Sequence, residues 1–228
     1  MLVYVRPILA WRFGLLEQLL LCTFCSVSVW FLLVSVSADG LLGLLPGHNG
    51  AGKTTTINML TGLYEPTAGD ATLYGRKIST DMQAVRKFIG VCPQHDVLFS
   101  SLTCREHLKI FGQLKFPEAS EDELEAQIES LLAQVGLSEK SSTQAVALSG
   151  GMKRKLSLLI SLIGDCRVVF LDEPTSGMDP FSRRSTWRFL RGNRSGRCIV
   201  LTGADLPPVH RLISFHKILM VQFGGHPP

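Results

Sequence analysis

Residues 47–54 have the sequence GHNGAGKT, in which glycines open and close a short loop and a lysine and a hydroxyl group follow. The spacing Gly47-x-x-x-x-Gly52-Lys53-Thr54 is typical of a loop that wraps a polyphosphate, because side chains at the glycine positions would collide with the anion. A helix beginning near Lys53 would add its positive dipole end. The pattern predicts a phosphate-binding site made of consecutive residues: Gly47, His48, Asn49, Gly50, Ala51, Gly52, Lys53, Thr54 and Thr55.

A second set of reactive residues follows the run RVVFL at 167–171, where Asp172 and Glu173 stand next to each other. The run has the composition of a buried parallel strand, and an open α/β sheet places its ligand at the carboxyl ends of such strands. We predict that Asp172 holds Mg²⁺ through water, together with the Thr54 hydroxyl, and that Glu173 polarises the water that attacks a phosphate. The alternative is an N-cap and a solvated charge before Pro174.

The segments around these residues alternate between strand and helix from about Asp39 onward. The apolar run LLGLL precedes the loop, KTTTINMLTGLY continues it as a helix, and ATLYGRKI is typical of a hairpin that turns at Gly75. AVRKFIGVCPQ is expected to give a helix, a strand and a loop. Further along, SGGMKRKLSLLISLI and FSRRSTWRFLRG are expected helices, and RVVFL and RCIVLT are expected strands. This alternation predicts an α/β fold with a mainly parallel sheet.

The alternation stops at about residues 98–148. Residues 103–115 have helical periodicity, and SEDELEAQIESLLAQVGL opens with the capping box Ser120-x-x-Glu123. The apolar residues of this second segment fall on one helical face: Leu124, Ile128, Leu131, Leu132 and Val135. We therefore expect an all-helical insert within the α/β core.

The overall composition is that of a globular protein with a large core, since 46% of the 228 residues are hydrophobic and 18% are charged. The net charge of +4 is small and scattered, which argues against a nucleic-acid partner. The cysteines lie mostly alone in expected strands and helices, which favours free thiols.

The first 38 residues differ from the rest, because residues 18–36 carry no charge and are long enough to cross a bilayer as a helix. Three interpretations remain open: a transmembrane helix, a signal peptide with its cleavage site near Ala38, and a leader that is not native to the domain. We therefore expect residues 1–38 to be an apolar leader and residues 39–228 to be the folded domain.

The sequence ALSGGMKRKLS at 147–157 resembles the signature motif of ABC transporter ATPases, which are P-loop NTPases. The loop at 47–54, the Gln94 loop and LDEPTSGMDP bring the resemblance to four motifs in the order of that family, over about residues 39–202. GHNGAGKTTT, VCPQHDVLF and Met152 are similar to the A subfamily, whose members move lipids across membranes.

The resemblance implies that ATP and Mg²⁺ are the cofactors and that two such domains pair head to tail. Ser149, Gly150, Gly151 and Met152 would then cap the nucleotide of the partner domain, with Asp179 at the dimer contact. A serine and free N–H groups at the start of a helix suit that role. Gln94 would reach the Mg²⁺ and the attacking water, and its loop would contact the transmembrane domains. The domain would be membrane-associated and face the cytoplasm.

Both ends of the chain depart from the family pattern. A histidine that contacts the γ-phosphate is expected after the strand RCIVLT, but Gly203 and Ala204 follow it, and His210 comes only after two prolines. The tail at 203–228 does not resemble the family. Two strands and an adenine-stacking aromatic are also expected before the loop, where Trp30 and Phe31 are weak candidates. An alternative function is therefore a truncated nucleotide-binding module whose hydrolysis is impaired.

Overall fold

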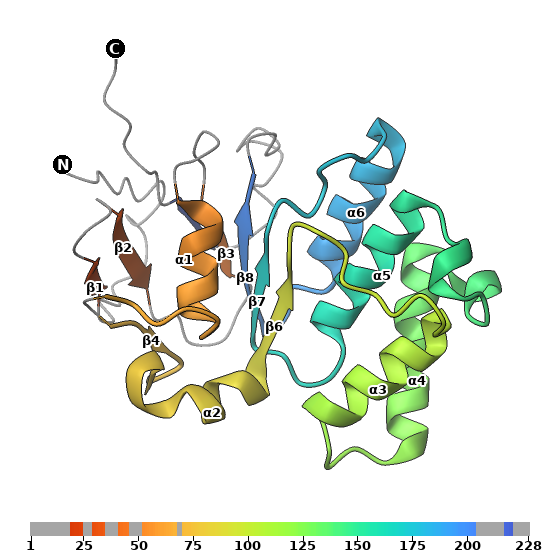
Figure 1. Cartoon of the computed structure of the whole chain (residues 1–228), viewed down its shortest axis with the longest axis horizontal. Coiled ribbons are helices and arrows are strands. Elements are labelled where there is room, and N and C mark those ends of the chain that lie inside the picture. The colour runs from red at the N-terminus through yellow and green to blue at the C-terminus, as the bar shows by residue number, and fades with distance from the viewer. Residues whose placement is uncertain are drawn as a thin grey trace. The chain divides into compact units, whose positions relative to one another are not determined.

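The computed structural model describes residues 19–24, 29–34, 41–45, 52–67, 70–203 and 217–220 (Figure 1). The chain divides into two units, one made of Met1–Arg86 with Arg194–Pro228 and the other of Lys87–Asn193. Each unit contains parallel strands and helices. Some of the sequence motifs lie in the first unit and the others lie in the second.

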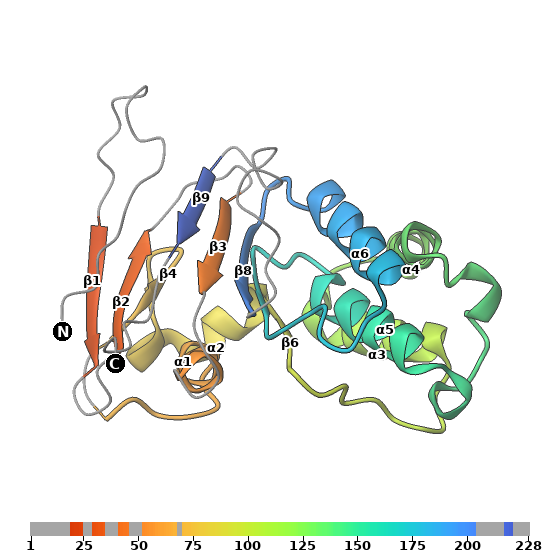
Figure 2. The same cartoon turned by 90° about the horizontal axis from the view of Figure 1, so that it is seen from above.

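In the first unit, β3 (Leu41–Leu45) is the middle one of three parallel strands (Figure 2). Its neighbours are β8 (Cys198–Thr202) and β9 (Lys217–Met220), and the register places Leu41 opposite the first residue of each. β8 is buried from Ile199 onward, as expected of a strand in a parallel sheet. The strands predicted at LLGLL and RCIVLT are confirmed, whereas β9 lies in the tail, where the sequence predicts no strand.

The first unit also contains α1 (Lys53–Leu60), a hairpin of β4 (Thr72–Leu73) and β5 (Arg76–Lys77), and most of α2 (Ile78–Phe88). The hairpin turns at Gly75, whose φ of 76° lies in the left-handed region that glycine adopts without strain. The predicted helix after the loop and the predicted hairpin are both confirmed.

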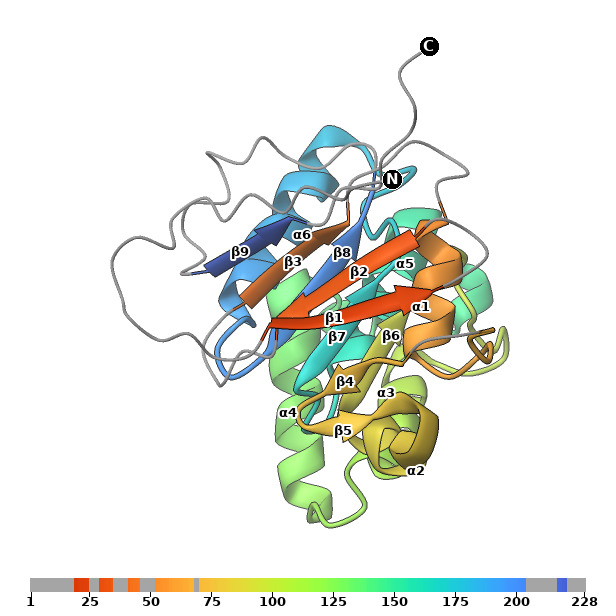
Figure 3. The same cartoon turned by 90° about the vertical axis from the view of Figure 1, so that its left-hand side faces the viewer.

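Two antiparallel strands, β1 (Leu19–Phe24) and β2 (Val29–Val34), form a hairpin near the N-terminus (Figure 3). The transmembrane-helix interpretation of residues 18–36 does not hold for these segments, because their backbone is extended. An uncharged run without periodicity is compatible with either structure, and the aromatic and β-branched residues of VWFLLV favour a strand. No helix within the described ranges is long and apolar enough to cross a membrane.

The second unit contains β6 (Ile89–Cys92) and β7 (Val168–Leu171), which pair in parallel (Figure 1). All of β7 is buried. Helix α5 (Gly150–Leu162) packs against β6 so closely that a Cβ built at Gly90 would overlap the carbonyl oxygen of Ser161. The carboxyl ends of both strands lead directly into the predicted site residues.

Two helices of the second unit, α3 (Cys104–Lys115) and α4 (Glu121–Val135), pack against each other and against α5. The predicted capping box is present in α4, where Ser120 accepts from the backbone of Glu123 and the Glu123 carboxylate accepts from the backbone of Ser120. The latter bond lowers the pKa of Glu123. The apolar face predicted for this helix is its buried face.

The remaining elements of the second unit are η1 (Ser138–Lys140), η2 (Ala145–Ala147) and α6 (Pro180–Gly192). Within residues 98–148 the described structure therefore consists of α3, α4 and two short 3-10 helices. The strands β6 and β7 on either side of this region are parallel partners. This arrangement has the predicted form of helices inserted between neighbouring strands of an α/β core.

Candidate nucleotide-binding and catalytic site

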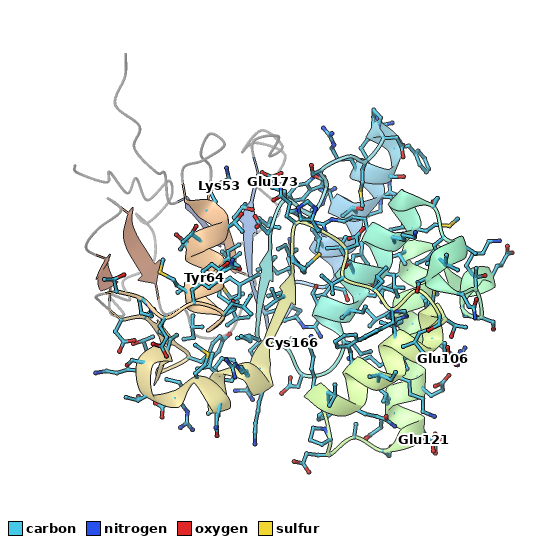
Figure 4. The ribbon with its side chains drawn as sticks, viewed as in Figure 1. Lys53, Tyr64, Glu106, Glu121, Cys166 and Glu173 are labelled. Carbon is cyan, nitrogen blue, oxygen red and sulfur yellow. The ribbon has the colours of Figure 1, made fainter. Side chains whose placement is uncertain are left out.

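Helix α1 begins at Lys53 (Figure 4). The residue before it is Gly52, whose φ of 85° lies in the left-handed region. The first turn of α1 has no acidic side chain, so the dipole of the helix can attract an anion there. Lys53 is 6% exposed, whereas Thr54 is exposed to solvent. The described end of the predicted phosphate loop thus has the helix start, the lysine and the hydroxyl that the motif requires.

The two predicted carboxylates follow the end of β7. Asp172 is 2% exposed, and its backbone N–H donates a hydrogen bond of 2.9 Å to the carbonyl oxygen of Cys92 at the end of β6. Glu173 has a φ of 47°, a left-handed conformation that costs a residue with a Cβ about 1–2 kcal/mol. Strained backbone conformations of this kind occur mainly at functional sites, so the φ of Glu173 supports its assignment to the site.

Gln94 and Glu173 are brought together although they come from different motifs. The Gln94 Nε2 atom donates a hydrogen bond of 3.3 Å to Glu173 Oε2. Both residues follow the carboxyl ends of paired parallel strands, β6 and β7. Gln94 is exposed, so the bond orients the carboxylate in a place that water can reach.

Arg154 lies within the signature run ALSGGMKRKLS, but the resemblance assigns it no role. Its side chain is buried, and it donates five hydrogen bonds, which is the number of N–H groups in a guanidinium. The acceptors are the carbonyl oxygens of Pro93 (2.6 Å), Asp172 (2.7 Å), Glu173 (3.0 Å) and Pro174 (3.1 Å) and a carboxylate oxygen of Asp96 (3.1 Å).

Arg154 belongs to the charged run KRK at 153–155, and a run of charges on a helix usually lies on its solvated face. The helical spacing places Arg154 on the buried face instead, because Arg154 stands four residues before Leu158 and eight before Leu162, both of which are buried. A charge on the apolar stripe of a helix needs buried partners. In this unit those partners surround Gln94 and Glu173.

The predicted signature residues begin α5. Ser149 is its N-cap, and the Ser149 hydroxyl accepts a 3.3 Å hydrogen bond from the backbone N–H of Met152. A Cβ built at Gly150 or Gly151 would meet no atom within 4 Å. Packing within the described chain therefore gives no reason for these two glycines, whereas the close approach of an external ligand would.

Asp179 is the N-cap of α6. Its Oδ1 atom accepts hydrogen bonds from the backbone N–H groups of Ser182 (3.0 Å) and Phe181 (2.9 Å). The hydrogen bonds from Ser182, and then that from Phe181, lower the pKa of Asp179. This capping role lies within the chain, and the predicted dimer contact of Asp179 remains a prediction.

The predicted magnesium ligands are divided between the two units, with Thr54 in the first and Gln94 and Asp172 in the second. Hydroxyl, amide and carboxylate oxygens are hard donors, which suits Mg²⁺. No group of three or more His, Cys, Asp or Glu side chains that could hold a metal occurs in the part of the chain that the structure describes. Protein-bound Mg²⁺ commonly has one or two carboxylates and completes its shell with water and substrate phosphates, and the predicted donors fit this mode.

Cys92 lies at the end of β6 near these groups but is not poised to react. Burial raises the pKa of its thiol to about 11, and the positive charge of Arg154 opposes this only in part. A thiol with this pKa is protonated at neutral pH and is a weak nucleophile. The chemistry of this region therefore belongs to its oxygen and nitrogen groups.

Several predicted residues lie outside the described part of the chain. They are the first five residues of the loop (47–51) and both Ala204 and His210. Trp30 and Phe31 belong to β2, whose backbone alone is described. The roles assigned to all of these residues remain predictions.

Comparison with known proteins finds members of the ABC transporter family. A family model described as ABC transporter matches residues 33–176. The glucosylceramide transporter ABCA12 of Mus musculus is 51% identical over 187 residues, which cover 82% of this chain and 7% of that protein. The retinal-specific phospholipid-transporting ATPase ABCA4 of Homo sapiens is 51% identical over 156 residues (68% and 7%), and ABC transporter A family member 2 of Arabidopsis thaliana is 50% identical over 172 residues (74% and 17%).

Two solved structures resemble the fold. The structure of an ATP binding subunit of an ABC transporter has a TM-score of 0.72 at 23% identity, covering 91% of this chain and 89% of that one. A dimeric ATP-binding cassette in a post-hydrolysis state, bound to ADP and Pi, has a TM-score of 0.71 at 18% identity, covering 87% of this chain and 88% of that one. The predicted P-loop NTPase fold is thereby confirmed.

Proposed function

This chain belongs to the ABC transporter family and resembles its A subfamily, and on that premise we propose that it binds and hydrolyses ATP to drive lipid transport across a membrane. The observation that carries the proposal is the hydrogen bond between Gln94 and Glu173 after two paired parallel strands. It joins an amide that can hold water to a carboxylate that can accept a proton from it. The chain spans 7% of the length of two of these relatives and 17% of the third, so transport is a property of a larger assembly.

Each predicted site residue has a role in this function. Lys53 neutralises the β- and γ-phosphates, and the N–H groups of residues 47–52 surround them. Glu173 polarises the attacking water, and Gln94 orients it. Mg²⁺, when bound, neutralises charge on the phosphates, and the Thr54 hydroxyl, Gln94 and Asp172, the last through water, would hold it.

The proposed partners are a second nucleotide-binding domain and the transmembrane domains of the transporter. Exposed Ser149 and the unobstructed Gly150 and Gly151 support a head-to-tail dimer, in which this helix start caps the nucleotide of the partner. The relatives are named for glucosylceramide and phospholipid transport, which favours a lipid as the transported molecule. Such a domain acts at the cytoplasmic face of a membrane, where ATP is available.

Nucleotide binding is tested most directly at Lys53. We expect the Lys53→Ala variant to bind a fluorescent ATP analogue much more weakly than the wild type in the presence of Mg²⁺. Lys77→Ala is the matched control, because Lys77 is an exposed lysine of β5 in the same unit. If the chain has no well-placed aromatic residue to stack on adenine, the wild type should bind ATP more weakly than an intact relative, by roughly 1–3 kcal/mol. Superimposable titrations of the wild type and Lys53→Ala would contradict nucleotide binding by this loop.

The second candidate function is a nucleotide-binding module that does not complete turnover by itself. Ala204 supports it, because the family pattern has a histidine at this position. Such a module would act by pairing with an intact domain. Steady-state phosphate release by the chain alone and mixed with an intact relative distinguishes the two candidates.

A further inference from the structure

The loop that carries Gln94 is held from both sides by one buried cation. The Arg154 guanidinium donates a 2.6 Å hydrogen bond to the carbonyl oxygen of Pro93 and a 3.1 Å hydrogen bond to the carboxylate of Asp96. These acceptors stand one residue before Gln94 and two residues after it. The backbone position of Gln94 thus depends on a side chain from α5.

The turn that carries Glu173 is held by the same guanidinium. The carbonyl oxygens of Asp172, Glu173 and Pro174 converge on Arg154 at 2.7, 3.0 and 3.1 Å. Three successive carbonyl dipoles repel one another unless a cation lies between them, and charge-assisted hydrogen bonds are the stronger ones. Arg154 therefore stabilises a turn in which Glu173 has a φ of 47°, a conformation that its backbone alone disfavours.

We propose that Arg154 is a positioning residue for ATP hydrolysis, which holds Gln94 and Glu173 in the geometry where the amide of one bonds the carboxylate of the other. The inference rests on the proposed function, because it assigns Arg154 to that reaction. A lysine cannot replace it, since an ammonium group is compact and has three donors where the site has five acceptors in a fixed fork. All five N–H groups of Arg154 bind protein oxygens, so Arg154 acts through the two loops.

Hydrogen exchange of the nucleotide-free chain tests the positioning itself. In Arg154→Lys we expect exchange in residues 93–98 and 172–176 to rise about tenfold or more, because both segments lose their common anchor. Arg167→Lys is the matched control. Its guanidinium is 56% exposed and lies 3.7 Å from Asp165, so exchange in the two segments should match the wild type. Unchanged protection in Arg154→Lys, or an equal rise throughout the second unit, would overturn the proposal.

Kinetics test the consequence for catalysis. We expect kcat of Arg154→Lys to fall about 100-fold while KM for ATP stays within about twofold, because positioning is lost and phosphate binding is not. Adding Gln94→Ala should reduce kcat far less in this background than in the wild type, since the same interaction is already lost. A normal kcat, or fully additive losses, would count against Arg154. If the wild type neither binds nor hydrolyses ATP, the proposed function fails, while the exchange experiment still decides whether Arg154 positions both segments.

A second variant keeps the test decisive if Arg154→Lys does not fold. Asp96→Ala removes one of the five acceptors and leaves the arginine with four carbonyl oxygens. Exchange should rise in residues 93–98 and remain at the wild-type level in 172–176, whose three bonds to Arg154 persist. Wild-type exchange in 93–98 would contradict the proposal that Arg154 holds the Gln94 loop from both sides, because the bond to Asp96 would then contribute nothing.

Discussion

Both ring nitrogens of His107 are used to fix the loop that follows Gln94. His107 is fully buried in α3. The backbone N–H of Phe99 donates to its Nε2 atom at 2.9 Å, and Nδ1 lies 2.8 Å from the carbonyl oxygen of Thr103. An N–H group can only donate and a carbonyl can only accept, so the proton is on Nδ1 and the ring is neutral. One side chain thus ties the loop to the start of α3.

Replacing His107 should destabilise the second unit. In His107→Leu the Phe99 N–H group and the Thr103 carbonyl oxygen both lose their bond to the ring, and each such bond contributes about 0.5–1.5 kcal/mol. Urea unfolding should show a lower midpoint with little change in slope. The control is His95→Leu, the same substitution at an exposed position, which should change the free energy of unfolding by no more than about 0.5 kcal/mol. Equal midpoints for the two variants would show that the ring bonds contribute nothing.

Residues that the motifs assign to a ligand were easier to predict from the sequence than residues that support them. Asp172, Glu173 and Gln94 belong to short motifs with a chemical reason for each position, and the structure brings Gln94 and Glu173 into contact. Arg154 and His107 could not be assigned in this way, because their partners are mostly backbone groups, which no side-chain pattern signals; those of Arg154 are also far away in the sequence. Only the burial of their helix faces indicates them.

The contact between α5 and β6 depends on the fact that Gly90 has no side chain. A Cβ at Gly90 would overlap the carbonyl oxygen of Ser161, and a backbone atom cannot move aside as the end of a flexible side chain can. This close approach sets how β6 lies against the helix that carries Ser149 and Arg154. Gly90 therefore controls the placement of an entire strand.

We expect Gly90→Ala to destabilise the second unit by about 3 kcal/mol or more, because strand and helix must separate to admit a methyl group. Gly192→Ala is the control. Gly192 ends α6, and no atom lies within 4 Å of a Cβ built there, so alanine should be neutral or stabilise by up to about 1 kcal/mol. Thermal and urea unfolding measure both. A Gly90→Ala variant as stable as the wild type would show that α5 and β6 can separate freely.

Most helices and strands could be predicted because local signals determine them. The capping box at Ser120, the turn at Gly75 and the apolar stripe of α4 each specify one structure. The strands β1 and β2 could not be predicted in this way, because an uncharged apolar run lacks the periodicity that distinguishes a strand from a helix. β9 was missed for another reason: its pairing with β3 is a long-range contact that no nearby residue signals.

The chain presents two helix starts that suit phosphate, at Lys53 in the first unit and at Ser149 in the second. In the proposed head-to-tail dimer each nucleotide uses one helix start from each domain. Turnover then depends on the dimer as well as on Glu173. Ala204 bears on the same step, since a histidine at this position in the family pattern contacts the γ-phosphate.

We expect hydrolysis by this chain to be slow, because losing a single donor that strengthens in the transition state typically lowers the rate by about 10²–10³. Ala204→His together with a family-like segment after it should raise steady-state phosphate release by at least about tenfold. The following segment must change as well, since Pro207 and Pro208 restrict the backbone that would aim the new ring.

In that repaired chain Glu173→Gln is the decisive second substitution. A glutamine keeps an oxygen that can accept the hydrogen bond from Gln94 but cannot take a proton from water, so the gain in phosphate release should vanish while ATP binding persists. Domains that bind ATP and cannot hydrolyse it should then accumulate as dimers, which light scattering after gel filtration with Mg²⁺ and ATP detects. Lys53→Ala in the same background should remain monomeric, because dimerisation requires the bound nucleotide. If the unrepaired chain already releases phosphate as fast as an intact relative, Ala204 does not impair turnover, and the first candidate function holds without repair.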